Sequence, residues 1–131
     1  LYEEGFWIIA PVALAALDAR QLLEQQPFIR FDRRAWAGRT IERDLRRMRL
    51  RVQTTMELDS QEAIIQMVSR GLGVAVVPLS SRNLEQLSHL DIRPFGSPQR
   101  MRHVVLLERE DRPRARLAVA LAKVIQKQTT S

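Results

Sequence analysis

The sequence contains no cysteine and no long apolar run, and these two absences exclude several classes of protein. Without cysteine the chain has neither a disulfide framework nor thiolate chemistry, which is typical of a reducing compartment. A membrane-spanning helix needs about 20 consecutive apolar residues. The nearest candidate, residues 6–17, is interrupted by Pro11 and lacks a preceding basic region. We therefore expect a cytoplasmic domain that does not contact the membrane.

Residues that carry catalysis or bind metals are scarce. The two histidines, His89 and His103, have no HxxxH pattern or acidic partner at a suitable spacing. Ser80 and Ser81 lack the GxSxG context of a hydrolase nucleophile and are better explained as helix caps. The GLG at Gly71 follows a helix and precedes a strand, the reverse of the order in a dinucleotide-binding loop. We expect no enzyme activity, no metal and no cofactor.

Lysine is also rare, with two residues against nineteen arginines, and the arginines are concentrated in one segment. Residues 30–51 hold nine arginines and three acidic residues, while outside them twelve basic residues balance twelve acidic ones. DNA binding would require a helix placed to enter a groove or follow phosphates. The sequence shows no such helix pair and few interleaved aromatics. We favour a solvated or interdomain face over DNA contact for this segment.

The most informative residues that are present form the segment Met56–Pro78. Asp59 followed by Glu62 predicts a helix start through a capping box. Apolar residues then recur at helical spacing up to Gly71, where a left-handed residue can end the helix. Residues 74–77 are apolar without alternation, which indicates a strand buried on both faces. The segment therefore predicts an open α/β sheet.

Strands and helices alternate along the chain. The expected strands lie at residues 6–10, 28–31, 52–58, 74–77, 92–95 and 104–107, with helices near residues 18–26, 39–49, 59–70, 81–87 and 113–127. This order predicts an open, mostly parallel sheet flanked by helices. The first and last strands depart from the pattern, and either could pair with the other.

Ligands of open α/β sheets bind beyond the carboxyl ends of the strands. The expected ends here are Phe31–Thr40, Leu58–Ser60 and Pro78–Ser81. Arg30, Arg33 and Arg34 lie at the first of them, which favours a small anion, such as a carboxylate, as the ligand. The alternative is that these arginines are solvated or pair with the three carboxylates of the same segment, at positions 32, 42 and 44.

Four segments together resemble the C-terminal effector-binding region of LysR-type transcriptional regulators. They are FWIIAP at residues 6–11, LDARQLLEQQPFIRF at 17–31, LDSQEAIIQMVSRGLGVAVVP at 58–78 and RHVVLLERED at 102–111. The GLG-V-VP element after an apolar helix is the most specific of them. The resemblance implies an effector domain with two α/β subdomains, similar to periplasmic binding proteins of the second type.

The resemblance also implies a division of the chain. Residues 1–11 would be the crossover strand from the first subdomain, and residues 12–102 the second effector-binding subdomain. Residues 103–131 would be the return crossover strand and the C-terminal helix of the first subdomain. The family's winged helix-turn-helix has no counterpart in this sequence, so we expect DNA contact only through an absent N-terminal domain.

In this family the effector lies between the subdomains, against the loop after the strand matched by PFIRF and near the crossovers. Carried over by position, the effector-binding residues would be Ala10, Pro11, Phe31, Asp32, Arg33, Arg34, Trp36, Asp59 and Pro78. Asp32 followed by two arginines is compatible with an anionic effector. An alternative is a type II periplasmic solute-binding protein of a transport system, which shares the architecture.

The resemblance further suggests that part of the apolar surface lacks its cover. The strands at residues 6–10 and 104–107 would face the missing part of the first subdomain. Exposed apolar patches of this kind favour association. We therefore expect a homo-oligomer.

Overall fold

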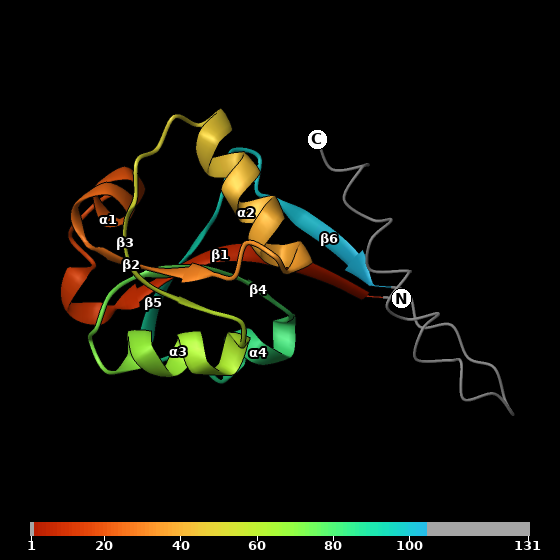
Figure 1. Cartoon of the computed structure of the whole chain (residues 1–131). Coiled ribbons are helices and arrows are strands. Elements are labelled where there is room, and N and C mark those ends of the chain that lie inside the picture. Colours follow the sequence, from red (N-terminus) through yellow and green to blue (C-terminus); the bar gives the residue numbers. More distant parts are fainter. Residues whose placement is uncertain (1, 105–131) are drawn as a thin grey trace, which may run out of the picture.

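The computed structural model describes residues 2–104 of the 131-residue chain (Figure 1). Its elements are β1 (Tyr2–Pro11), a 3₁₀ turn (Val12–Leu14), α1 (Ala19–Gln25), β2 (Pro27–Phe31), α2 (Trp36–Arg47), β3 (Gln53–Leu58), α3 (Gln61–Ser69), β4 (Ala75–Leu79), α4 (Ser81–Glu85), β5 (Leu90–Pro94) and β6 (Met101–Val104). The strand expected at residues 104–107 and the final helix lie, beyond Val104, outside the described residues. The α/β class expected from the sequence is confirmed.

The long strand β1 is the centre of the sheet. It pairs antiparallel with β4 through Ile8 and Val76, with β5 through Ile9 and Ile92, and with β6 at its start. The pairing that the sequence allowed was between residues 6–10 and 104–107, and the second of these strands lies, beyond Val104, outside the described residues; β1 instead pairs with β6 over Tyr2–Gly5. β2 and β3 are parallel and β2 bridges in parallel to the start of β4, because helical crossovers join these three strands. Residues 2–104 thus form two sheets, an antiparallel one of β4, β1, β5 and β6 and a parallel pair of β2 and β3, so the parallel character expected from the sequence is limited to β2, β3 and the bridge to β4.

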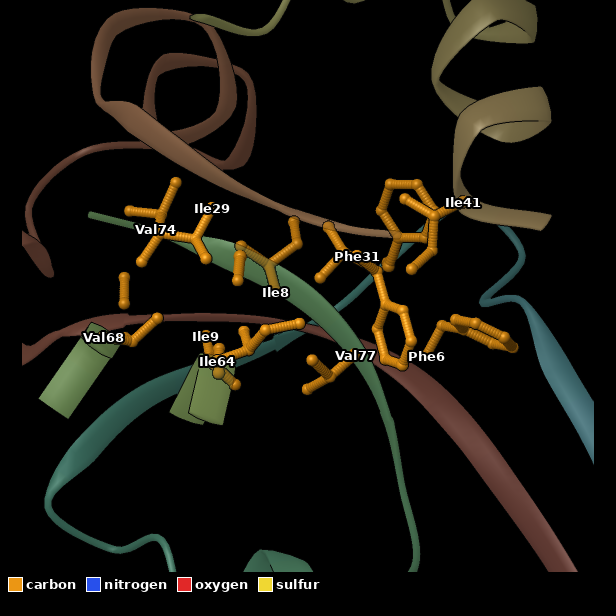
Figure 2. Close-up of a cluster of buried hydrophobic side chains, with 14 of the residues drawn as sticks. Phe6, Ile8, Ile9, Ile29, Phe31, Ile41, Ile64, Val68, Val74 and Val77 are labelled. Carbon is orange, nitrogen blue, oxygen red and sulfur yellow. The ribbon is translucent and has the colours of Figure 1, made fainter. Parts of the chain in front are cut away.

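Helices cover the sheet on both sides, with α1 and α2 on one side and α3 and α4 on the other (Figure 1). Ile41 and Leu45 of α2 and Ile64 and Val68 of α3 are at most 2% exposed. Figure 2 shows Phe6, Phe31 and Ile41 together in this core. All five residues of β4 are buried, as its unbroken apolar run predicts. Each large core side chain contributes about 1.5–3 kcal/mol by leaving water.

The start of α3 differs from the expectation by one residue. Ser60 is the N-cap, and its Oγ accepts from the Ala63 amide at 3.3 Å. Asp59 comes one residue earlier and is exposed, because the chain leaves β3 at Leu58 and turns before the helix begins. The cap expected at Asp59 is therefore wrong, and Asp59 is left at the sheet edge.

The glycine stop of α3 is confirmed. Gly71 has φ 80° and donates to the Val68 carbonyl at 2.9 Å, and Leu72 donates to the Met67 carbonyl at 3.1 Å. These two bonds form a Schellman motif, which satisfies carbonyls that the helix leaves open. Ser80 caps α4 as expected, and Asp18 caps α1, each through a capping box.

Helix α2 begins at Trp36, three residues before the helix expected near residues 39–49. Its N-cap, Ala35, makes no side-chain cap, so the usual sequence signal for a helix start is missing. The first turn instead packs on the preceding loop at Gly38. A Cβ at this position would lie 1.8 Å from the Asp32 carbonyl oxygen, which only glycine avoids.

Candidate functional site

The carboxyl ends of β2, β3 and β4 meet at one edge of the domain, as the sequence predicts. Phe31 is the register partner of Leu58, and the Asp32 amide donates to the Leu58 carbonyl at 2.8 Å. At the end of β4, Leu79 is the register partner of Gly5 in β1. The hollows along this edge include one after β2 and β3 and one after β4, and a further one lies between α3 and α4, beside Ser60 and Asn83.

The first hollow, here the Asp32 groove, is lined by Asp32, Arg33, Arg34 and Glu57 and has a volume of about 320 Å³. The guanidinium of Arg34 donates to Asp32 from Nη2 at 2.9 Å and from Nε at 3.2 Å, and its amide donates to Asp32 Oδ1 at 2.8 Å. The amide of Arg33 donates to Glu57 Oε2 at 2.9 Å, and its Nη2 lies 3.4 Å from Oε1. The groove thus presents two ion pairs side by side.

The hydrogen bonds of the groove keep its carboxyl groups ionised. The Arg34 side chain, followed by the Arg34 amide, lowers the pKa of Asp32. The Arg33 amide, followed by its side chain, lowers the pKa of Glu57. Conversely, the bond to Asp32 raises the pKa of Arg34. At neutral pH the groove therefore carries fixed charges of both signs.

Arg30 does not reach the groove. Its Nη1 donates to Glu42 Oε1 on α2 and its Nε donates to Thr54 Oγ1 at 3.0 Å. Its side chain is only 13% exposed, and this burial lowers its pKa. The sequence left open whether these arginines are solvated or paired. The structure shows that Arg30 pairs with Glu42 and Arg34 with Asp32. Arg33 instead pairs with Glu57, which sequence reasoning did not single out.

Trp36, at the start of α2, contacts side chains of β6 and β1. The Arg102 guanidinium of β6 lies 5.0 Å from the Trp36 ring centre, a cation–π distance, and the Phe6 ring lies 6.2 Å away. Arg102 also donates from Nε to Glu4 Oε1, and both side chains are buried. The side chain at the start of α2 is thereby in contact with the β1–β6 pair.

The second hollow, here the β4 pocket, has a volume of about 890 Å³ and lies between the start of β1 and the end of β4. Its lining includes Glu3, Gly5, Trp7, Ser80 and Met101. The indole Nε1 of Trp7 is buried and has no hydrogen-bond partner among residues 2–104. The sequence did not predict Trp7 as a pocket residue. Its place in the pocket follows from the pairing of β1 with β4, which only the tertiary structure shows. Glu57 could have been noticed as the polar position beside Leu58 at the end of its strand.

The remaining predicted site residues lie in different places. Phe31 is 8% exposed and belongs to the core, and Pro78 is buried in β4 opposite Phe6. Ala10 and Pro11 pair with Asp91 and Leu90 of β5, beside the start of β4 and not its end. The structure does not bring these two together with the groove, because β1 runs antiparallel to β4: Gly5 lies beside Leu79 at the end of β4, and the end of β1 lies beside the start of β4.

Metal ligation and membrane insertion can be examined only for the described residues. Within residues 2–104, no three His, Asp or Glu side chains gather to hold a metal ion. In the same range, no helix has the length and apolar character to cross a bilayer. His89 Nε2 lies 3.0 Å from Ser69 Oγ, and His103 Nε2 lies 2.7 Å from Glu3 Oε2.

The architecture and the polar strand edge define a class of protein, the ligand-binding α/β modules of the periplasmic-binding-protein type II-like fold. The chain belongs to the LysR substrate binding domain family, which matches residues 1–130. This match confirms the resemblance stated from the sequence and favours it over a solute-binding protein of a transport system. Domains of this family sense ligands, in agreement with the expectation that the chain is not an enzyme.

Solved structures show the same fold at low sequence identity. The effector binding domain of QuiR in complex with shikimate is 13% identical, with a TM-score of 0.64, and the match covers 98% of this chain and 64% of that one. The CcmR regulatory domain of Synechocystis PCC6803 in complex with 2-PG is 20% identical, with a TM-score of 0.64 and coverages of 98% and 65%. Full-length CbnR complexed with its target DNA is 10% identical, with a TM-score of 0.53 and coverages of 92% and 44%.

The chain thus spans less than two thirds of the length of the effector domains that it matches. No curated protein sequence matches it.

Proposed function

We propose that the chain is the effector-sensing part of a cytoplasmic LysR-type transcriptional regulator and that it binds a small organic anion at the carboxyl edge of the sheet. This proposal rests on the Asp32 groove, where the ion pairs Arg33–Glu57 and Arg34–Asp32 lie side by side at the edge where α/β folds bind ligands. Family membership supplies the regulatory context.

The arginines of the groove can receive an anion without unfolding their surroundings. The side chains of Arg33 and Arg34 are 58% and 90% exposed, and Arg34 uses Nε and Nη2 on Asp32. A guanidinium has five N–H donors in a planar fork, so a ligand carboxylate can share these groups with the protein. The ionised carboxylates of Asp32 and Glu57 accept hydrogen bonds only. An acid that also carries hydroxyl or ammonium donors therefore fits the groove best.

The proposed contact residues are Asp32, Arg33, Arg34 and Glu57, which line the groove, with Trp36 and Asp59 beside them at the same edge. Phe31 and Pro78 are buried and would support the edge from the core. Ala10 and Pro11 lie at the other end of β4 and are unsupported as contacts. Small ligands are known for two domains of this fold, QuiR with shikimate and CcmR with 2-PG.

The signal would pass through the crossovers to a DNA-binding N-terminal domain. We assign residues 1–11 and 103–131 to the crossovers and their helix, and residues 12–102 to one wall of a cleft between two subdomains. The pairing of Glu3 with His103 and of Tyr2 with Val104, which joins the two crossover segments, supports this division. An effector that prefers the closed arrangement would shift the population towards it. We also propose that the regulator is a homo-oligomer.

Calorimetric titration of the chain with a panel of organic acids, with and without hydroxyl groups, tests the ligand class. We expect Arg33→Ala and Arg34→Ala each to weaken binding of the best acid by roughly tenfold, since a charge-assisted hydrogen bond contributes about 1.5–3 kcal/mol. Arg70→Ala, at an exposed arginine after α3, is the matched control and should leave the affinity unchanged. Equal affinity in all three variants would end the anion assignment.

A further inference from the structure

Helix α2 carries a row of outward arginines on the side opposite its buried residues. Arg39, Arg43 and Arg46 lie within about 60° of the helix circumference, since each residue advances the helix by 100°. Arg47 flanks the row, and these four residues are named the arginine face. The side chains of Arg46 and Arg47 are 77% and 57% exposed.

The acidic residues of the same segment do not neutralise this face, because each accepts its shortest hydrogen bonds from an arginine that is not part of the face. Asp44 is 5% exposed and accepts from Arg100 Nε at 2.7 Å and from Arg100 Nη2 at 3.1 Å. Glu42 accepts from Arg30, and Asp32 from Arg34. The arginine face has only longer second contacts to these carboxylates, at 3.7 Å for Arg46 and 3.9 Å for Arg47. The local excess of positive charge therefore remains on the outside of α2.

An uncompensated row of this kind has a free-energy cost. Arg39 and Arg43, and likewise Arg43 and Arg47, are spaced i, i+4, where like charges destabilise a helix by about 0.2–0.5 kcal/mol per pair. A bound polyanion would remove this repulsion and release its own counterions. The row runs from Arg39 to Arg47, roughly 12 Å along the helix axis at about 1.5 Å per residue.

The chemistry of the face indicates what kind of polyanion it fits. Protein interfaces depend on buried aromatic or apolar anchors, and the arginine face has none. The large apolar residues exposed within residues 2–104 are Val12 and Leu72, neither of which lies on α2. The helix also lacks Asn and Gln, and its one threonine, Thr40, is 2% exposed. Apart from the arginines, α2 therefore offers no exposed side chain of the kinds that commonly recognise DNA bases. Guanidinium groups in a row match a row of phosphates.

We propose that the arginine face of α2 binds the phosphate backbone of duplex DNA without reading its sequence. The sequence alone favours a solvated or interdomain face for this segment and predicts DNA contact only through an absent N-terminal domain. The charge pairing in the folded domain changes that expectation. In a DNA-binding regulator the face supplies a second contact, separate from the Asp32 groove and independent of any effector.

The test measures binding of the 131-residue chain to a labelled random-sequence duplex of about 30 base pairs by fluorescence anisotropy across a salt series. The variant Arg43→Gln/Arg46→Gln removes two charges and keeps good helix formers. Arg70→Gln/Arg82→Gln, at exposed arginines outside α2, is the matched control. We expect the first variant to lose about tenfold in affinity at low salt and about two units of the log–log salt slope. The control should behave as the parent chain.

Three results would overturn the proposal. They are no binding of the duplex at low salt, equal losses in the two double variants, and tighter binding of poly-L-glutamate than of the duplex. The last result would assign the face to an acidic protein surface instead. Titration with the organic acid should be unchanged in Arg43→Gln/Arg46→Gln, so this proposal and that of the effector site fail separately.

Discussion

At the residue scale, the two longest helices within residues 2–104, α2 and α3, end in the same backbone geometry but with different residues. Arg49 has φ 59° and donates to the Arg46 carbonyl at 3.0 Å, while Leu50 donates to the Leu45 carbonyl at 3.0 Å. This is the Schellman geometry that Gly71 adopts after α3. Because a left-handed conformation costs a side-chain-bearing residue about 1–2 kcal/mol, Arg49 is strained where Gly71 is not.

Exchanging the residue types should therefore have opposite effects on stability. We expect Arg49→Gly to raise the free energy of unfolding by about 0.5–1 kcal/mol, and Gly71→Ala to lower it by about 1 kcal/mol. No atom lies within 4 Å of a Cβ at Gly71, so its effect reports conformation alone. Urea unfolding measures both. Arg70→Gly, at φ −89°, is the control for arginine removal and should destabilise; a stabilising Arg70→Gly would refute the conformational explanation.

At the element scale, buried ion pairs attach β6 and the turn before it to the rest of the domain. Arg100 holds Asp44 of α2, with both side chains 7% exposed, and Arg102 holds Glu4 of β1. Removing one member of a buried pair leaves a charge without a partner, at a cost of about 3–5 kcal/mol. Replacing both members by apolar residues avoids most of that cost.

Arg100→Met should accordingly lower the free energy of unfolding by about 3–5 kcal/mol, and Asp44→Leu/Arg100→Met by much less. The comparison is made by urea unfolding. Arg20→Met, in a surface pair with Glu24 at 3.1 Å, is the control and should cost under about 1 kcal/mol. A double variant less stable than Arg100→Met would show that the pair, and not the lone carboxylate, determines stability.

At the scale of the whole molecule, the groove couples stability to acid pH. The ordinary pKa values of Asp32 and Glu57 are 3.8 and 4.5, and both are lowered in the folded domain. A carboxyl group whose pKa is lowered in the folded state stabilises the fold at pH values above its ordinary, unfolded-state pKa. This contribution is lost as the pH falls through the folded-state pKa. The relevant window therefore lies below about pH 4.5 for Glu57 and below about pH 3.8 for Asp32.

The urea midpoint of the parent chain should exceed that of Asp32→Asn at neutral pH, and the difference should shrink below about pH 3.8. Asp59→Asn, at an exposed carboxylate of the same edge, is the control. A difference between parent and Asp32→Asn that stays constant down to pH 3 would mean that the carboxylate is not held by Arg34 in solution.

Local patterns in the sequence were sufficient for most elements and for the class of fold. The caps at Asp18 and Ser80, the glycine stop at Gly71 and the buried run of β4 all act between residues a few positions apart, so the sequence shows them directly. The predicted start of α2 is wrong because no capping side chain marks the true one. The N-cap of α3 is Ser60, one residue after the predicted Asp59.

The sequence by itself determined an α/β domain of the LysR substrate binding family, with arginines at one strand edge and along one helix. Only the tertiary structure decided the partners of those arginines. Arg33 faces Glu57 across 24 positions, Arg100 faces Asp44 across 56, and Arg102 faces Glu4 across 98. Charge interactions act through space, and no local pattern encodes contacts at such separations. The fold therefore determines which charges are neutralised and which remain for a ligand or a polyanion.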